Sequence, residues 1–432
     1  MKIIGNKSVS KRKFASKVKI SAIFIACILL IGALIPTTLT LFPGQLLNQV
    51  LADTVTGTDG DDNLEGSDND DDIEGKGGDD RIDSKGGNDR NTGDKDEGDG
   101  DGGDDNIDSG DGNDENIGDN EFGGGNGGDD NIDSGDGFDI NTGDNFFGDG
   151  DGGDDVINSG DDNDVNRGDN FLGNGDGGDD VINSGDGFVD KNIGDNEVGA
   201  GNGGDDVINS GDGFDVNVGD NELGDGDGGD DVINSGAEDD QNTGDNFFGV
   251  GNGGDDVINS GEGSDLNRGD NLNGNGDGGD DVINSGTGDD TNIGDNFNNF
   301  NGNGDGGDDV INSGTGDDTN IGDNRFGGGD GGDDVINSGT GDDTNIGDND
   351  EGDGGGGDDV IKSGKGNDIN FGDNRIDSGL SAGGNDKINA AQGDDELTGG
   401  GGADKFKCGS GVDTVTDFNE EEDKASGNCE IT

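Results

Sequence analysis

The residues best suited to chemistry in this sequence are aspartates that recur in glycine-rich stretches. Ca²⁺ takes roughly six to eight oxygen ligands, from carboxylates and backbone carbonyls. A glycine-rich turn that ends in aspartate supplies both kinds, because glycine lets the backbone approach an ion closely. The pattern therefore predicts repeated calcium sites. The nine-residue stretch Gly-Gly-Asp-Asp-Val-Ile-Asn-Ser-Gly, or a close variant of it, begins at Gly102, Gly127, Gly152, Gly177, Gly203, Gly228, Gly253, Gly278, Gly306, Gly331 and Gly356.

The composition favours cation binding and argues against several other functions. The chain holds 105 Asp+Glu and 23 Lys+Arg, for a formal net charge of −82. Nucleic acid and anionic lipid would be repelled by this charge, so neither is an expected partner. The chain has no His, which removes His-dependent nucleophilic dyads and imidazole metal sites. No pair of acids stands apart from the repeat, so we expect no enzymatic activity.

The repeating unit divides into parts of nine, nine and seven residues, as in 226–250. Twelve such units, allowing for short insertions, are expected to form calcium-binding coils over 75–380. Plain nonapeptides without the seven-residue part flank them at 53–74 and 381–416, and 417–432 is expected to cap the array. A fixed period of this kind, about 25 residues, is typical of a solenoid.

This period predicts an all-β fold, a parallel β-roll or β-helix solenoid with one coil per unit. The isoleucine after each aspartate pair suits a stacked strand. Three short strands per coil are favoured; the alternative is a two-sided roll of about 18 residues per turn with a seven-residue bulge. One asparagine column could form an inward hydrogen-bonded ladder or line a solvated corner, and the sequence leaves both open. Its members are Asn116, Asn141, Asn166, Asn192, Asn217, Asn242, Asn267, Asn292, Asn320, Asn345 and Asn370.

The nonapeptides resemble the repeats-in-toxin, or hemolysin-type calcium-binding, family. Its pattern is Gly-Gly-x-Gly-x-Asp-x-U-x, where U is a large apolar residue. In 226–234, Gly229 stands in the fourth place, Asp231 in the sixth and Ile233 in the apolar place. The resemblance covers nearly everything after Ala52. It implies that turn carbonyls and the sixth-place aspartate bind calcium that is shared with the neighbouring turn.

The resemblance assigns two sets of aspartate ligands. The first set is Asp62, Asp80, Asp105, Asp130, Asp155, Asp180, Asp206, Asp231, Asp256, Asp281, Asp309, Asp334, Asp359, Asp386 and Asp395. The second set, from the second nonapeptide of each unit, is Asp114, Asp139, Asp164, Asp190, Asp215, Asp240, Asp265, Asp290, Asp318, Asp343 and Asp368.

Residues 1–52 have the order of parts of a secretory signal peptide. A basic stretch ends at Lys19, an apolar run covers 20–35, and small-residue cleavage signals follow at 50–52. The alternative is an uncleaved membrane anchor, because 20–42 is long enough to span a bilayer. Either interpretation places the repeats in a secreted or cell-surface protein.

Cys408 and Cys429 are the two cysteines beyond this segment. An even pair in an exported chain usually forms a disulfide. Closing this short loop would add about 3 kcal/mol and clamp the end of the solenoid.

Stacking the coils requires a cation. Strands in a sheet lie about 4.8 Å apart, and two like charges at that distance repel by about 3.5 kcal/mol at an effective dielectric constant of 20. We therefore expect Ca²⁺ to be the cofactor and the chain to fold when it binds.

The sequence predicts an extracellular calcium-binding repeat protein with a structural or cell-surface role, with calcium ions and the cell envelope or matrix as partners. One alternative is a calcium-dependent adhesin or an ice-binding surface protein, for which Thr287, Thr315 and Thr340 form a short aligned row. A less favoured alternative is the export tail of a secreted hydrolase.

Overall fold

The computed structural model describes residues 54–95, 100–120, 122–249, 251–272, 276–296, 304–326, 329–351, 354–376 and 383–432. They belong to the second of two compact units, Leu51–Thr432. The predicted signal peptide or anchor at 1–52 lies outside the described residues. Within the described ranges the chain forms strands and turns, and none of it is a helix that could cross a membrane.

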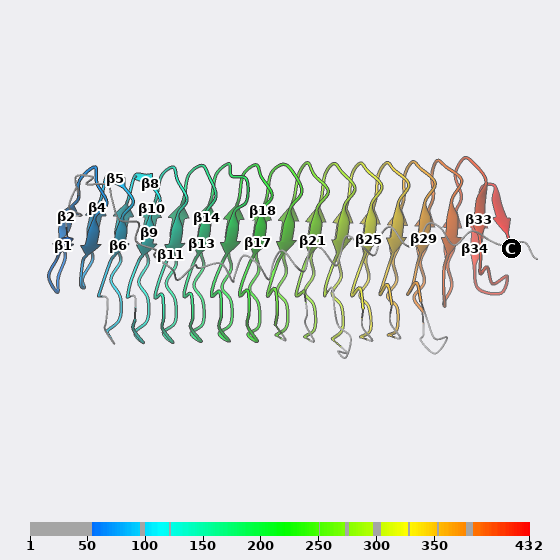
Figure 1. The fold of residues 1–432 in the computed structure, drawn as a ribbon. Helices are drawn as coiled ribbons and strands as arrows, with labels where there is room; N and C mark the ends of the chain where they lie inside the picture. Colours follow the sequence, from blue (N-terminus) through cyan, green and yellow to red (C-terminus); the bar gives the residue numbers. More distant parts are fainter. Residues whose placement is uncertain are drawn as a thin grey trace, which may run out of the picture. The chain divides into compact units, whose positions relative to one another are not determined.

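Almost all strands belong to two parallel sheets (Figure 1). The first, called here the isoleucine sheet, contains β2 (Asn63–Glu65), β4 (Arg81–Asp83), β7 (Asn106–Asp108), β10 (Asn131–Asp133), β12 (Val156–Asn158), β14 (Val181–Asn183), β16 (Val207–Asn209), β18 (Val232–Asn234), β20 (Val257–Asn259), β22 (Val282–Asn284), β24 (Val310–Asn312), β26 (Val335–Asn337), β28 (Val360–Lys362), β30 (Lys387–Asn389), β32 (Lys405–Lys407) and β34 (Lys424–Ser426).

The second sheet, called here the asparagine sheet, takes the alternate strands along the chain. It contains β1 (Thr54–Thr56), β3 (Asp72–Glu74), β6 (Arg90–Thr92), β9 (Glu115–Ile117), β11 (Ile140–Thr142), β13 (Val165–Arg167), β15 (Lys191–Ile193), β17 (Val216–Val218), β19 (Gln241–Thr243), β21 (Leu266–Arg268), β23 (Thr291–Ile293), β25 (Thr319–Ile321), β27 (Thr344–Ile346), β29 (Ile369–Phe371), β31 (Glu396–Thr398), β33 (Asp413–Val415) and β35 (Cys429–Ile431). The short pair β5 (Gly86–Gly87) and β8 (Asp111–Gly112) joins two turns between the sheets.

The strand register confirms the predicted solenoid with one repeating unit per coil. Val156 of β12 pairs with Val181 of β14, the same place in the next unit. At the N-terminal end the interval is shorter, because Asn63 pairs with Arg81, only two nonapeptides further along the chain. The favoured three-sided coil is also confirmed, because the seven-residue part adds a third row of parallel contacts. Single-residue bridges, such as that of Phe147 with Phe122 and Leu172, form this row.

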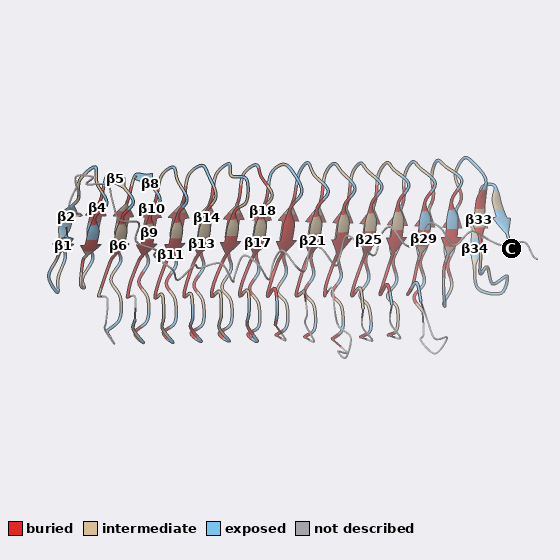
Figure 2. Cartoon of the chain, viewed as in Figure 1, coloured by how far each residue is buried: buried red, intermediate tan, exposed pale blue. Residues whose placement is uncertain are grey.

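The main core lies between the two sheets and combines isoleucine with asparagine. The isoleucine at the centre of each isoleucine-sheet strand is buried, as Ile157 and Ile182 illustrate. Facing it, Asn116 Nδ2 donates to Asn141 Oδ1 at 2.9 Å and to Ser109 Oγ at 3.0 Å. The asparagine column is therefore an inward ladder, and the solvated-corner alternative is wrong for it. Figure 2 shows buried and half-buried strands joined by more exposed turns.

A second, smaller core lies on the outer side of the asparagine sheet. Ile293, Ile321 and Ile346, the third residues of their strands, are buried in a cluster of their own. The guanidinium of Arg167, at the same place in β13, lies 4.8 Å from the ring centroid of Phe171 in the following seven-residue part. The seven-residue part, called here the arm, therefore covers the outer face of the asparagine sheet. The outer face of the isoleucine sheet has no such cover from the described residues.

The C-terminal end is joined by a disulfide between Cys408 and Cys429, whose Cα atoms are 5.4 Å apart. Cys408 is buried and belongs to the main core, next to Phe406 of β32. The bond therefore ties β35, at the end of the chain, to the turn that follows β32.

Candidate metal centre

Buried aspartates converge in groups of three between successive coils. In one group, a carboxylate oxygen from each of Asp144, Asp155 and Asp169 lies within 4.8 Å of the other two. Asp155 directly precedes β12, whereas Asp144 and Asp169 belong to the Gly-Asp-Asn sequences that open two successive arms. The same arrangement recurs in Asp94–Asp105–Asp119, Asp119–Asp130–Asp144, Asp169–Asp180–Asp195 and Asp195–Asp206–Asp220, and in four more groups among the described residues.

The aspartates of the Gly-Asp pairs that open the arms are called here the bridging row, and successive groups share them, as they share Asp119, Asp169 and Asp195. Asp144, for example, is shared by the group with Asp130 and the group with Asp155. Its two carboxylate oxygens point toward different coils: Oδ1 faces Gly127 and Oδ2 faces Gly152. A carboxylate placed in this way can link one ion to the next along the stack.

The aspartates that precede the isoleucine-sheet strands, called here the first row, form a continuous hydrogen-bonded line. The backbone N–H of Asp155 donates to Asp180 Oδ1 at 2.6 Å, and that of Asp180 donates to Asp206 Oδ1 at 2.6 Å. Oδ2 of each of these residues is buried and has no hydrogen-bond partner. Leaving a buried carboxylate oxygen unpaired is costly, so these oxygens are suited to a cation.

Glycine provides the space that such a cation needs. A Cβ added to Gly143 would collide with Asp155 Oδ2 and with the carbonyl oxygen of Gly168. The absence of a side chain there leaves room beside a carboxylate and a carbonyl, the two ligand types that Ca²⁺ takes in proteins. The residues present therefore fit a calcium ion.

The electrostatics of the first row also favour a bound cation. Burial, followed by the neighbouring charge of Asp180, raises the pKa of Asp155 well above its usual range. Burial also raises the pKa of Asp105 to about 9. These carboxylates resist ionisation in the bare structure, because each charged form is desolvated and lies next to other carboxylates.

A second row of aspartates precedes the strands of the asparagine sheet. The backbone N–H of Asp139 donates to Asp164 Oδ1 at 2.9 Å, and Oδ2 of both residues is buried without a hydrogen-bond partner. Burial raises the pKa of Asp164 to about 8. Because the two strands of a coil run in opposite directions, the second row lies at the opposite edge from the first (Figure 1). It repeats the hydrogen-bonding pattern of the first row, but the five groups of three aspartates given above contain none of its members.

The structure brings the predicted aspartates together in these two rows, with one change of place. Asp395 was grouped with the first set, but it accepts the backbone N–H of Asp368 at 2.9 Å and so belongs to the second row. Alternate nonapeptides contribute to alternate rows, and this order continues past the last arm, so Asp386 lies in the first row and Asp395 in the second. Asp71, Asp89, Asp404 and Asp413 continue the rows and were missed, although each holds the sixth place of a nonapeptide or its equivalent.

The bridging row was also missed by the sequence analysis. The sequence signal for it is the Gly-Asp pair that opens every arm, usually followed by asparagine. Its members are Asp94, Asp119, Asp144, Asp169, Asp195, Asp220, Asp245, Asp270, Asp295, Asp323, Asp348 and Asp373.

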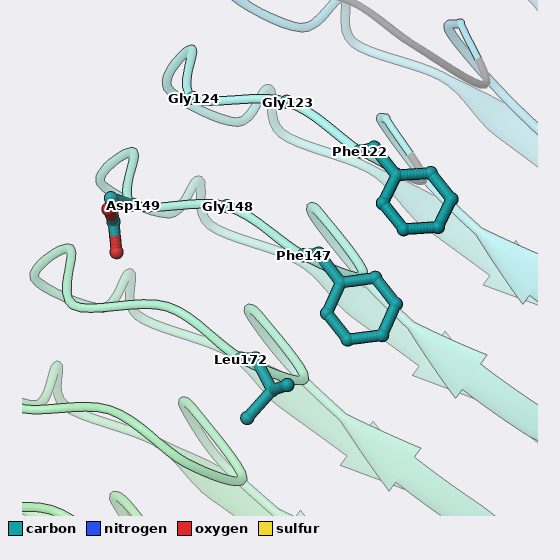
Figure 3. A pocket seen from close by; sticks show the side chains of 7 residues that line it. All are labelled: Phe122, Gly123, Gly124, Phe147, Gly148, Asp149 and Leu172. Carbon is teal, nitrogen blue, oxygen red and sulfur yellow. The ribbon is translucent and has the colours of Figure 1, made fainter.

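The third side carries an apolar column in place of carboxylate clusters. Phe122 and Phe147 stack with ring centroids 5.0 Å apart, and with Leu172 they line a shallow pocket beside Asp149 (Figure 3). One carboxylate at its rim does not supply the ligands of a metal ion. Among the described residues, the groups of three aspartates therefore lie where each arm begins and just before the isoleucine-sheet strands.

The comparison with known protein families matches the same repeats. The family model for the RTX calcium-binding nonapeptide repeat (4 copies) matches residues 52–90, 250–266 and 380–415. No curated protein matches the chain. The matched segments include both ends of the solenoid and about two nonapeptides in its middle, and the intervening coils keep the same register. The chain therefore has a β-solenoid fold that contains RTX calcium-binding nonapeptide repeats in the matched segments, and such repeats imply a calcium-binding repeat protein.

Proposed function

We propose that this protein is an extracellular structural element whose solenoid forms when Ca²⁺ binds between successive coils. The observation that carries the proposal is the series of buried three-aspartate groups, each with carboxylate oxygens within 4.8 Å of one another. Asp155, Asp144 and Asp169, with the carbonyl of Gly168, would hold one such ion, and equivalent residues would hold its neighbours.

The energetics explain why folding would depend on the ion. Three ionised carboxylates at this separation repel by about 10 kcal/mol in total at an effective dielectric constant of 20. The stability of a whole domain is typically only about 5–15 kcal/mol, so a stack of such groups cannot persist with all carboxylates ionised and no counter-charge. A divalent cation in each group converts this repulsion into attraction, and its binding free energy becomes folding free energy.

The donor set favours calcium over other common metals. Every proposed ligand is a carboxylate or carbonyl oxygen, which suits hard cations, whereas zinc and copper sites draw on imidazole or thiolate. Ca²⁺ accepts irregular sets of roughly six to eight oxygens, while Mg²⁺ demands a near-octahedral set and loses its water reluctantly. A turn with several carbonyls and shared carboxylates is better matched to Ca²⁺.

Three arguments support a location outside the cytoplasm. Disulfides persist mainly in oxidising compartments, and Cys408 and Cys429 are bonded. Millimolar extracellular Ca²⁺ would also keep low-affinity sites filled. Residues 1–52, with the order of parts of a secretory signal, are consistent with export.

We infer a structural role because repeats of this family are typically structural and not catalytic. In the described residues, the recurrent clusters of functional groups are carboxylates held inside the stack. Such clusters are suited to holding coils together, and the cell envelope or extracellular matrix is the expected setting.

The direct test is a Ca²⁺ titration of residues 53–432 followed by far-UV circular dichroism, with Mg²⁺ as the control ion. We expect a coil-like spectrum without metal and a cooperative gain of β signal with Ca²⁺. A metal-free chain that is already fully β-structured, or one that stays disordered at millimolar Ca²⁺, would show the proposal to be wrong. Sedimentation of the calcium-loaded protein with purified cell envelopes tests the proposed location.

A further inference from the structure

The outer face of the isoleucine sheet has a charge pattern that calcium binding does not explain. The central residue of each strand points into the core, so the first and third residues point outward. In eight consecutive strands, β12 to β26, these outward residues are valine and asparagine. A broad uncharged face is unexpected on a chain with a net charge of −82.

The four strands at the N-terminal end of the same face carry four outward acids and one outward base, Arg81 of β4, whose Nη1 lies 3.9 Å from Asp83 Oδ2. Each of β2, β4, β7 and β10 contributes one outward acid, namely Glu65, Asp83, Asp108 and Asp133. Asp83, Asp108 and Asp133 stand in direct register on neighbouring strands. Like charges aligned in this way repel, so this end would gain from an opposite charge laid over it.

The four strands at the C-terminal end are basic. Lys362 of β28, Lys387 of β30, Lys405 and Lys407 of β32, and Lys424 of β34 all point outward and are exposed. Lys387, Lys405 and Lys424 are paired in direct register. Aligned lysines repel one another too, and they stand on a chain that has 105 acids.

We propose that this face docks a second copy of the chain in antiparallel orientation. The face has 16 strands, of which the first four are net negative as a group despite Arg81, the middle eight are uncharged and the last four are basic. When one copy is turned end for end, its acidic strands lie over the basic strands of the other. β2 then faces β34, β4 faces β32, β7 faces β30 and β10 faces β28. A parallel pairing would place acid on acid, so charge selects the antiparallel one.

The middle of the face suits such a contact. Its valines, from Val156 to Val335, are exposed or half-buried. Its asparagines form a chain in which Asn183 Nδ2 donates to Asn158 Oδ1 at 2.9 Å and Asn209 Nδ2 to Asn183 Oδ1 at 2.9 Å. Their amides are thus largely satisfied within one copy, which makes the face easier to desolvate.

The area of the face is adequate for a dimer. Sixteen strands about 4.8 Å apart, each about 10 Å wide over its three residues, present roughly 770 Å². A standard specific interface buries about 800 Å² per partner. The aspartates of the preceding turns, such as the exposed Asp179 and Asp205, flank the face and oppose pairing. Pairing is therefore measured with millimolar Ca²⁺ present.

The test is sedimentation velocity of residues 51–432, which form a compact unit by themselves. We expect the calcium-loaded wild type to be a dimer. One variant reverses the basic end with Lys362→Glu, Lys387→Glu, Lys405→Glu and Lys424→Glu. The other reverses the acidic end with Glu65→Lys, Asp83→Lys, Asp108→Lys and Asp133→Lys. We expect each variant alone to dissociate with a Kd raised at least about tenfold, and an equimolar mixture of the two to dimerise.

Two further measurements separate charge complementarity from other causes. Lys365→Glu changes the same charge on an exposed turn beside the sheet, so it should leave the dimer Kd unchanged, whereas Lys362→Glu should raise it. The second measurement is disulfide cross-linking, which requires no reversal of charge. Asn131→Cys in one copy should cross-link to Val360→Cys in another, because β10 faces β28.

Several outcomes would overturn the proposal. A wild type that is monomeric at high micromolar concentration would do so, as would a mixture of the reversed variants that fails to pair. Cross-linking of Asn131→Cys only to its own copy in the partner would show a parallel arrangement. A monomer whose lysine strands bind inorganic polyphosphate would show that this end of the face serves a polyanion instead.

Discussion

The sharing of bridging-row aspartates between two groups makes a quantitative prediction. Asp169 belongs to the group with Asp144 and Asp155 and to the group with Asp180 and Asp195, whereas Asp180 belongs to the second of these. Asp169→Asn therefore removes a charged ligand from two proposed ions, and Asp180→Asn removes one from a single ion. We expect the first variant to lose about twice as many bound Ca²⁺ ions as the second.

The same geometry predicts an opposite effect on the metal-free chain. With carboxylate oxygens within 4.8 Å, each ionised pair repels by about 3.5 kcal/mol at an effective dielectric constant of 20. Asp169 takes part in four such pairs and Asp180 in two, so neutralisation relieves about 14 and about 7 kcal/mol of gross repulsion, respectively. Asp169→Asn should therefore retain more β signal than the wild type at the lowest calcium concentrations, although it binds fewer ions.

Equilibrium dialysis gives the number of bound ions, and far-UV circular dichroism of the same samples reports folding. Asp176→Asn is the matched control, because it removes one charge from an exposed position of the neighbouring turn. Equal losses of calcium for Asp169→Asn and Asp180→Asn would refute the shared-ligand reasoning. A comparable loss for Asp176→Asn would show that overall charge, and not the buried groups, governs binding.

Three other predictions concern pH, a glycine and the disulfide. Burial raises the pKa of Asp105 to about 9 and that of Asp164 to about 8. In the unfolded chain both carboxyl groups titrate near pH 4. The metal-free solenoid is therefore most stable at acid pH and loses stability as the pH rises towards the folded-state pKa values. Circular dichroism without metal should therefore show more β structure at about pH 5 than at about pH 8, and the reverse trend would contradict the burial argument. Gly143→Ala places a Cβ against Asp155 Oδ2 and the Gly168 carbonyl, so calorimetric titration should show about one ion fewer; an unchanged isotherm would mean that this space holds no ion. Replacing Cys408 and Cys429 by serine should lower the free energy of unfolding of the calcium-loaded chain by about 3 kcal/mol in denaturant titration, and an unchanged midpoint would show that the bond does not restrain the end of the solenoid.

Much of the coil could be predicted because each unit makes the same contacts with its neighbours. The isoleucine column and the sixth-place aspartates follow from one nonapeptide and its copy a fixed distance along the chain. The inward asparagine ladder could not be distinguished from a solvated corner by sequence, because asparagine is also common in turns. Only the burial of the side chains separates these two alternatives. Asn116 shows the ladder because it faces Ser109 and Asn141 across the core.

The bridging row could not be assigned from the repeat alone. Asp144 approaches Asp155 because the arm folds back over the asparagine sheet, and that packing depends on residues such as Phe171 and Arg167. The residue at the place of Phe171 varies between units, as Glu197 and Glu222 show, so this place has no fixed apolar pattern in the sequence. The row of Asp395, by contrast, follows from the sequence, because alternate nonapeptides contribute to alternate rows.

The strand register does not depend on the length of the connections between strands. Val282 pairs with Val310 across a unit that is lengthened by an insertion, and Val165 pairs with Lys191 across another. The neighbouring strands nevertheless keep the same alignment. Units of different length thus already occur in this chain without a shift of the strands. A foreign peptide inserted there would be presented at regular intervals on a scaffold whose strands and carboxylates need not change. Chains of this design could therefore serve as calcium-gated display arrays, assembled or dismantled by adding or chelating the metal.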